Sequence, residues 1–297
     1  MTAEFLLNGL VNGIAVGSIY ALIALGFALL YKSTKILNLA HGELVLLGGY
    51  VAIALTQVVP FPIAVVLTLG LAALLGFAIE RVIMRPLFGQ PLLSLIIVTL
   101  ALGYIIRGTM VGIWGGSTRT FPAVLPAGLV YIAGIPMQTV GAFSAATAAV
   151  LLVVFWLFFR YSLAGIAMRA AANEQLTAST LGVSLRRVFA YAWAFASAAG
   201  AIGGILLGLW LGVNFALGAV GLKALAAGIL GGLDSIPGAI LGGLAIGVIE
   251  TVVGGYIDTN VIYGLYGFKD IIAFVVILLV LLVRPYGLFG TEHIERL

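Results

Sequence analysis

Two ionisable side chains, His41 and Glu43, stand where a polar turn re-enters an apolar stretch of the sequence. A histidine beside a carboxylate can bind a metal ion or serve in acid–base catalysis. The other histidine of the chain is His293, in the tail, and there is no cysteine. Two protein ligands do not complete a zinc site, so we expect neither a metal nor a hydrolase centre. We expect a gate or helix-start role, with Glu43 stabilised in the first turn of a helix.

A further set of ionisable residues lies within or beside apolar runs, where charged groups are costly and are candidates for function. The set is Glu80, Arg107, Lys223, Asp234, Glu250, Asp258 and Asp270. Two of them have a plain structural explanation. Glu80 is next to Arg81 at the expected headgroup level, and Asp234 comes directly before a turn.

The composition places these residues in a membrane protein. Hydrophobic residues make up 63% of the chain and charged residues 8%, and the mean hydropathy is +1.25. These values lie far outside the range of soluble globular domains. The apolar runs are long and continuous rather than alternating, which predicts helices. The expected fold is an all-α polytopic membrane protein, with residues 1–297 forming a single transmembrane domain.

Nine apolar spans can be counted along the chain. They cover residues 5–30, 44–59, 63–84, 92–114, 139–159, 188–212, 219–233, 236–253 and 270–283. Several are shorter than the roughly 20 residues of a full crossing. A tight DSIPG turn joins 219–233 to 236–253, and this pair can form two tilted spans or one broken re-entrant hairpin. We therefore predict about seven to nine transmembrane helices.

Lysine and arginine residues give the orientation of the chain. They follow the odd-numbered spans, at Lys32, Lys35, Arg81, Arg85, Arg160, Arg169, Arg186 and Arg187. Short basic loops stay in the cytoplasm. The N-terminus is therefore expected outside and the tail from Arg284 inside. Residues 115–138 form the longest external loop, and their three prolines predict an extended lid on the surface.

The largest cytoplasmic loop, residues 160–187, contains a polar interval at 169–187. Residues 171–181 are good helix formers with no proline or glycine, and Gly182 can end a helix. We predict one short helix lying along the membrane face. On these grounds alone, an ordinary solvated loop helix is an equal alternative.

Five separated motifs resemble those of branched-chain amino acid ABC transporter permeases of the high-affinity Liv type. They are residues 17–50, with the core Asn-Leu-Ala-His-Gly-Glu, then 80–87 (ERVIMRPL), 165–208, 221–250 and 268–290. The resemblance covers nearly the whole chain and is to the shorter of the two permease subunits. Permeases for other amino acids and for urea look similar, so the motifs say less about the substrate.

The resemblance implies a multi-pass permease of the bacterial inner membrane that imports leucine, isoleucine, valine or related neutral amino acids without a cofactor. Its implied partners are ABC ATPase subunits, an extracytoplasmic substrate-binding protein and a second permease, in a heterodimer rather than a homodimer, with lipid around it and no nucleic acid. It also implies that the polar interval is a coupling helix that inserts into the ATPase. The expected contact positions are Asn173, Glu174, Leu176, Ala178, Leu181 and Gly182.

One stretch, residues 26–33, has the spacing of a nucleotide-binding loop. Tyr31 stands where that motif needs its second glycine, and the stretch ends an apolar run instead of leading from a strand into a helix. We interpret the match as chance. The chain is then not an enzyme, and the resemblance places ATP hydrolysis on separate subunits.

Asn38 and Asn214 begin two similar motifs, Asn-Leu-Ala-His-Gly and Asn-Phe-Ala-Leu-Gly. Each is followed by a short apolar run that reaches a proline turn, at Pro60 or Pro237. Because the basic loops place the first motif inside and the second outside, we put forward inverted repeats of about 1–160 and 187–290, joined by the coupling loop 160–187. Such repeats bracket a transport path, and each asparagine could cap its helix. Coincidence is the alternative in so alanine- and glycine-rich a chain.

Glycines recur at four-residue spacing on several of the predicted spans. The series are Gly9, Gly13 and Gly17; Gly200, Gly204, Gly208 and Gly212; Gly238 and Gly242; and Gly243 and Gly247. Small residues at this spacing allow two helices to approach closely in a membrane. Packing within the chain explains most of them, and a subunit interface is the alternative for at least one series.

Three classes of function are compatible with these patterns. The first is an ABC importer permease, whose path or gate would include Asn38, His41, Glu43 and Asn214. The second is a secondary transporter with Glu43, Glu250 or Asp270 as proton or ion sites. The third is an intramembrane enzyme built on His41 and Glu43. A coupling helix favours the first class, because a self-sufficient carrier needs none.

Overall fold

The computed structural model describes residues 3–126, 128–132, 134–260 and 267–290. Its elements are α1 (Ala3–Thr34), α2 (His41–Thr56), α3 (Phe61–Ile79), η1 (Glu80–Met84), η2 (Arg85–Leu87), α4 (Leu92–Trp114), β1 (Leu129–Ile132), β2 (Ile135–Gln138), α5 (Thr139–Tyr161), α6 (Leu163–Asn173), α7 (Gln175–Thr180), α8 (Leu185–Leu211), α9 (Leu217–Gly231), α10 (Ile236–Ile249), η3 (Glu250–Gly254), α11 (Gly255–Asn260) and α12 (Phe268–Val283).

Each of the nine predicted apolar spans overlaps a helix, or two successive helices, over most of its length. Six helical stretches of the described chain are long and apolar enough to cross a membrane, namely Glu4–Thr34, Phe61–Leu87, Leu92–Trp114, Thr139–Tyr161, Leu185–Leu211 and Ile236–Ile257. Two shorter apolar helices, α2 and α9, follow the two asparagine motifs, and α12 has 16 residues. The fold class is therefore a polytopic helical membrane protein.

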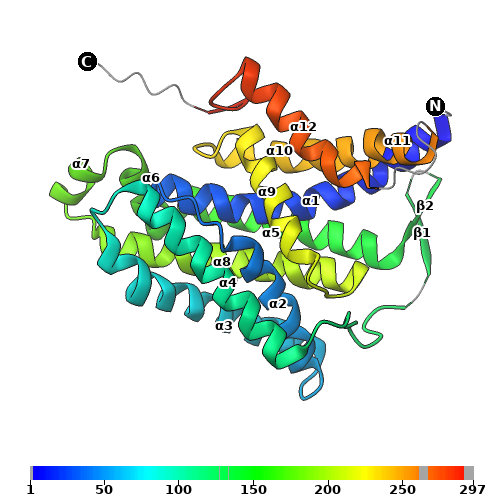
Figure 1. Cartoon of the computed structure of the whole chain (residues 1–297), viewed down its shortest axis with the longest axis horizontal. Helices are drawn as coiled ribbons and strands as arrows, with labels where there is room; N and C mark the ends of the chain where they lie inside the picture. The colour runs from blue at the N-terminus through cyan, green and yellow to red at the C-terminus, as the bar shows by residue number, and fades with distance from the viewer. Residues whose placement is uncertain (1–2, 127, 133, 261–266, 291–297) are drawn as a thin grey trace.

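Helix α1 forms the centre of the bundle (Figure 1). In its most apolar window 89% of the residues are buried, against 22% for α3, α4 and α5. Its glycine series allows α10 to approach closely, since a Cβ on Gly13 would lie 2.7 Å from Val248 Cα and one on Gly17 would lie 2.9 Å from Leu244 Cα. Packing within the chain explains this series.

Helix α8 uses its own glycine series in the same way, against α2. A Cβ on Gly204 would collide with the backbone carbonyl of Val45, and one on Gly200 would lie 3.2 Å from the His41 ring. Gly212 is outside the helix, because it follows the last helical residue and has φ +76°. These contacts place α2 inside the bundle, between α8 and the peripheral helices.

The two ends of the bundle differ in character. The N-terminus and the β1–β2 hairpin lie at one end, and α6, α7 and the α9–α10 turn lie at the other (Figure 1). At this second end Lys35 Nζ lies 2.6 Å from Asp234 Oδ1, and the amide of Leu288 donates to the carbonyl of Leu230. We call it the basic end and the first one the hairpin end. The α9–α10 turn therefore reaches the end of the bundle that the lysines and arginines mark as cytoplasmic.

The external loop is more ordered than the extended lid that its prolines predict. Arg119 and Val213 exchange backbone hydrogen bonds of 2.9 and 2.7 Å, so the loop crosses the end of α8. Strands β1 and β2 then form an antiparallel hairpin in which Leu129 is opposite Gln138. Gly134, at φ +81°, lies in the turn. The small sheet is an exception to the all-α prediction, because short β-branched runs next to a turn can pair locally.

Candidate functional site

The predicted coupling helix consists of two short helices rather than one. Helix α6 begins after Ser162, whose hydroxyl accepts a 2.9 Å hydrogen bond from the amide of Gly165. It ends at Asn173, and Glu174 is extended, with φ −152° and ψ 105°. Helix α7 then starts at Gln175. The prediction of one continuous helix over residues 171–181 was wrong, because helix propensity favours each segment but does not fix the bend between them.

Helix α7 ends as its sequence predicts. Gly182 has φ +88°, a left-handed conformation that glycine adopts without a Cβ clash. Its amide donates to the carbonyl of Ser179 at 3.1 Å, and the amide of Val183 donates to the carbonyl of Ala178 at 3.0 Å. This pair of bonds is the Schellman motif, which satisfies the last carbonyls of a helix.

The six predicted contact positions do not all face outward. Leu176 is 73% exposed and Leu181 is 80% exposed. Asn173, Glu174 and Gly182 are also exposed. Ala178 is 3% exposed and packs into the core, so it offers no surface in this conformation. The α6–α7 loop therefore presents the exposed side chains of Leu176 and Leu181 at the basic end.

The loop is tied to the bundle by its flanking residues. Arg160 lies over the ring of Trp156, 5.1 Å from its centroid, and accepts through its carbonyl a 3.2 Å hydrogen bond from Arg169. A cavity of about 360 Å³ lies beneath the loop, lined by residues that include Gln175, Arg186 and Phe88. The cavity borders α7 and the starts of α4 and α8.

The two asparagine motifs adopt the same local structure. Asn38 Oδ1 accepts a hydrogen bond from the amide of Ala40 at 3.0 Å, and Asn214 Oδ1 accepts one from the amide of Ala216 at 2.9 Å. Neither side chain caps its helix, because Ala40 and Ala216 occupy the N-cap positions. Each asparagine instead forms a turn just before the helix.

The starts of α2 and α9 meet inside the bundle. A Cβ on Gly42 would collide with the backbone of α9 and lie 3.2 Å from Gly221 Cα. Gly218, in the first turn of α9, faces the other side of the contact, where a Cβ would lie 2.6 Å from Arg107 Nη2 and 3.1 Å from Glu43 Oε1. Glycine at these positions allows the two helix starts and a charged pair to share one small space.

That charged pair joins α2 to α4. Arg107 Nη2 lies 2.6 Å from Glu43 Oε1, with the Glu43 side chain 14% exposed and that of Arg107 41% exposed. Glu43 is in the first turn of α2, as predicted. Arg107 is the single charged residue of α4. Its isolation in an apolar helix was the signal in the sequence, but nothing there identified its partner.

His41 lies apart from this pair. Its side chain is 1% exposed and its ring packs at 4.4 Å against Phe27, in the interior between α1 and α8. Residues two apart on a helix do not face each other. Among the residues that the structure describes, no three His, Cys, Asp or Glu side chains could hold a metal ion. The geometry thus does not bring His41 and Glu43 together.

Three aromatic rings lie on the hairpin side of the charged pair. Tyr50 stacks on Trp114 with centroids 5.3 Å apart, and it contacts Phe215 at 5.7 Å. A cavity of about 470 Å³ lies beyond them, lined by residues that include Gln57, Trp114 and Arg119. The aromatic layer formed by Tyr50, Trp114 and Phe215 therefore separates this outer cavity from the pair.

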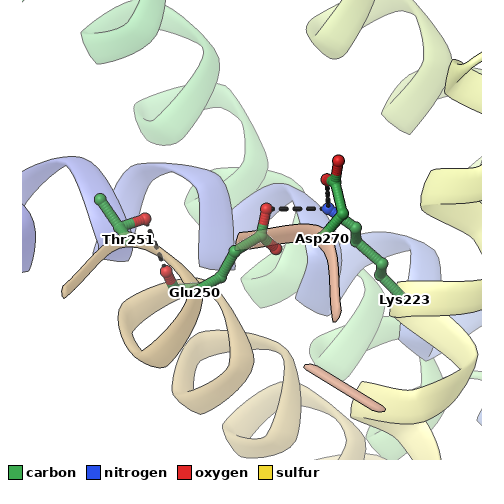
Figure 2. A network of polar contacts seen from close by, with 5 residues as sticks. Lys223, Glu250, Thr251 and Asp270 are labelled. Atoms are coloured by element: carbon green, nitrogen blue, oxygen red, sulfur yellow. Dashed lines mark hydrogen bonds and ion pairs between the residues drawn. The ribbon is translucent and has the colours of Figure 1, made fainter. Parts of the chain in front are cut away.

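A second charged cluster joins α9, η3 and α12. Figure 2 shows Lys223 between two carboxylates, with its Nζ 2.9 Å from Glu250 Oε1 and 2.6 Å from Asp270 Oδ1. Lys223 is 9% and Glu250 4% exposed, whereas Asp270 is 75% exposed. Thr251 is bonded to the carbonyl of Gly247 at 2.8 Å. These ionisable residues are far apart in the sequence, and the fold brings them into contact.

Two of the remaining ionisable candidates, Glu80 and Asp234, also have partners. Both carboxylate oxygens of Glu80 accept from Arg85, at 3.2 and 2.8 Å, and Asp234 accepts from Lys35. Asp258 lies in α11, and its side chain is outside the described part of the chain.

Comparisons with known proteins match the whole chain. A family model described as the permease component of the branched-chain amino acid transport system matches residues 9–281. The chain is 32% identical, over 100% of both chains, to the high-affinity branched-chain amino acid transport system permease protein LivH of Salmonella typhimurium. It is 32% identical to the corresponding protein BraD of Pseudomonas aeruginosa, over 98% of this chain and 97% of that one. Among solved structures, PsaBC from Streptococcus pneumoniae in complex with Fab covers 95% of this chain and 92% of that chain, with a TM-score of 0.48 and 18% identity.

Proposed function

Because this chain belongs to the family of branched-chain amino acid transport permease components, we propose that it is the transmembrane permease subunit of an ATP-binding-cassette importer. It passes leucine, isoleucine, valine or related neutral amino acids inward across the bacterial inner membrane. The permease itself carries no nucleotide site, and separate ATPase subunits hydrolyse ATP.

The observation that carries this proposal is the exposed α6–α7 loop. Leu176 in α7 and Leu181 at its C-cap are 73% and 80% exposed at the basic end, next to the Gly182 turn. Apolar side chains that project from a polar loop are typical of docking sites, where they fill pockets on a partner. The partner is the ATPase, and the contact positions are Asn173, Glu174, Leu176, Leu181 and Gly182.

The transport path runs past the starts of α2 and α9, on the side where Glu43 and Arg107 lie. Asn38 and Asn214 form matching turns before these two helices, which supports inverted repeats of about 1–160 and 187–290. Broken helices of such repeats commonly line a path near the middle of the membrane. Glu43 lies in the path, and His41 acts as a packing residue that fixes α2 against α1 and α8.

The importer has two further partners. A substrate-binding protein delivers the amino acid at the hairpin end, opposite the coupling loop. A second permease subunit completes the membrane domain, as a heterodimer. The lightly buried helices α3, α4 and α5 provide surface for that subunit and for lipid, since only 22% of their most apolar windows is buried within the chain.

Association with the ATPase tests the proposal. Leu176→Asp and Leu181→Asp should each weaken binding of the ATPase to the detergent-solubilised permease by at least about tenfold, because a desolvated apolar anchor is worth about 2 kcal/mol or more. The matched control is Leu129→Asp in β1, a 59% exposed leucine at the opposite end. Equal binding by all three variants and the unmodified protein would show that the loop is not the docking site.

A further inference from the structure

The pair of Glu43 and Arg107 has unused hydrogen-bonding capacity. Within the described part of the chain, Glu43 Oε2 and Arg107 Nε are both buried without a hydrogen-bond partner. A guanidinium has five N–H donors, and a carboxylate has four acceptor positions. Buried polar atoms without partners are costly, so a polar group that is absent from the chain itself is expected here.

The pair lies deep in the membrane. From Glu43, α2 continues to Thr56, roughly 20 Å at 1.5 Å per residue. From Leu92 at the start of α4 to Arg107 the rise is roughly 22 Å. Both distances place the charges within a hydrocarbon layer of about 30 Å. Ionisable groups at that depth face a water-filled cavity or another charge.

The surroundings of the pair leave one side of Arg107 open. Its side chain is 41% exposed on the surface of the chain, whereas Glu43 is 14% exposed. Gly218 borders both groups, and the pair fills the space that a side chain at this position would occupy. The exposed part of the Arg107 side chain is therefore accessible from the surface of the chain.

Aromatic rings lie between this site and the outer cavity at the hairpin end. Tyr50, Trp114 and Phe215 lie seven residues beyond Glu43 on α2, seven beyond Arg107 on α4 and three before Gly218, respectively. Three separate segments thus place an aromatic ring on the same side of the pair. The outer cavity beyond them is lined in part by Arg119 and Gln57.

We propose that Glu43 and Arg107 form a binding site for the charged groups of a free amino acid zwitterion during transport. The substrate carboxylate pairs with Arg107, whose planar guanidinium suits bidentate contact. The substrate ammonium pairs with Glu43, and the apolar side chain rests against the aromatic layer. The proposal rests on the proposed function and adds to it the part of the substrate that this chain recognises.

Equilibrium binding to the assembled permease and ATPase, in nanodiscs and without the binding protein, tests the proposal. Radiolabelled leucine should bind the unmodified complex. Competition by 3-methylbutylamine, which lacks the carboxylate, and by 4-methylpentanoate, which lacks the ammonium, should each be at least about tenfold weaker than competition by leucine. No leucine binding, or equal competition by either analogue, would overturn the proposal without any mutation.

Variants locate the site on these two residues. Arg107→Gln and Glu43→Gln should each lower leucine affinity by at least about tenfold. The matched control is Asp234→Asn, which neutralises the carboxylate of another ion pair between separate segments and should bind leucine unchanged. Unchanged affinity in Arg107→Gln would refute the assignment. The amount of ATPase bound to the permease is measured in every preparation. Loss of leucine binding with the ATPase still bound would count against this site alone, whereas loss of the ATPase from the unmodified protein would count against the permease assignment.

Discussion

Helix α9 contacts two clusters of charged residues that differ in how completely they are paired. Gly218 borders the pair of Glu43 and Arg107, and Lys223, little more than one turn further on, bonds to both Glu250 and Asp270. In the lysine cluster the cation contacts two carboxylates, and within the described part of the chain Glu250 Oε2 is the one buried side-chain atom of the cluster without a hydrogen-bond partner. The pair has one short contact, two buried atoms without partners in the described chain, and an aromatic layer next to it. Charged clusters next to the same helix can therefore serve different purposes. The number of buried polar atoms without partners distinguishes the binding pair from the structural cluster.

The largest effect on stability is expected at the lysine cluster. Lys223→Met removes the cation and leaves Glu250 as a buried carboxylate, 4% exposed. Removing one partner of a buried ion pair costs about 3–5 kcal/mol. Thermal unfolding of the purified protein in detergent should show a clearly lower midpoint. An unfolding midpoint equal to that of the unmodified protein would show that the cluster does not stabilise the fold.

Loss of Arg107 from the charged pair should affect transport more than stability, in contrast to loss of Lys223 from the lysine cluster. Arg107→Gln should cost about 1–3 kcal/mol in unfolding free energy, less than Lys223→Met, because the Arg107 side chain is 41% exposed. Leucine uptake by the assembled transporter should nevertheless fall at least about tenfold. The comparison fails if Arg107→Gln lowers the unfolding midpoint more than Lys223→Met does while uptake is retained.

A smaller effect is expected when a side chain is added at Gly218, next to the pair of Glu43 and Arg107. In Gly218→Ala the new Cβ would lie 2.6 Å from Arg107 Nη2, so the pair must shift. Overpacking of this kind costs about 1–3 kcal/mol, and uptake should decrease. Gly108→Ala, on the same helix as Arg107, meets no atom within 4 Å and serves as the control. Equal uptake by the two variants would mean that the space beside Gly218 is not used.

The smallest effect is expected at Gly182, at the end of the proposed coupling helix. Gly182 has φ +88°, so Gly182→Ala strains the turn by about 1 kcal/mol. ATPase affinity should fall about fivefold, measured by biolayer interferometry, while the unfolding midpoint changes little. A fall equal to that of Leu181→Asp would mean that the turn, and not the leucine, makes the contact.

Features that depend on local pattern were predictable from the sequence. Hydropathy located all nine helical spans, four-residue spacing identified glycines such as Gly13 and Gly17 that pack against α10, and Gly182 marked the end of α7. These features follow from residues close together in the chain.

Features that depend on tertiary contacts were not predictable. Arg107 pairs with a residue 64 positions earlier, and Lys223 with residues 27 and 47 positions later, so no local spacing reveals either. The bend at Glu174 and the β1–β2 hairpin were missed because propensity does not fix where a short segment turns. The burial of Ala178 was missed because no local rule indicated which side of α7 faces the bundle.

Leucine uptake into proteoliposomes is the most direct test of the permease assignment. One preparation contains this chain with its partner permease and ATPase, with ATP in the lumen and the binding protein outside; the other contains the chain alone with a proton gradient. We predict accumulation in the first that depends on ATP, and none in the second. Accumulation by the chain alone on the proton gradient would contradict the account.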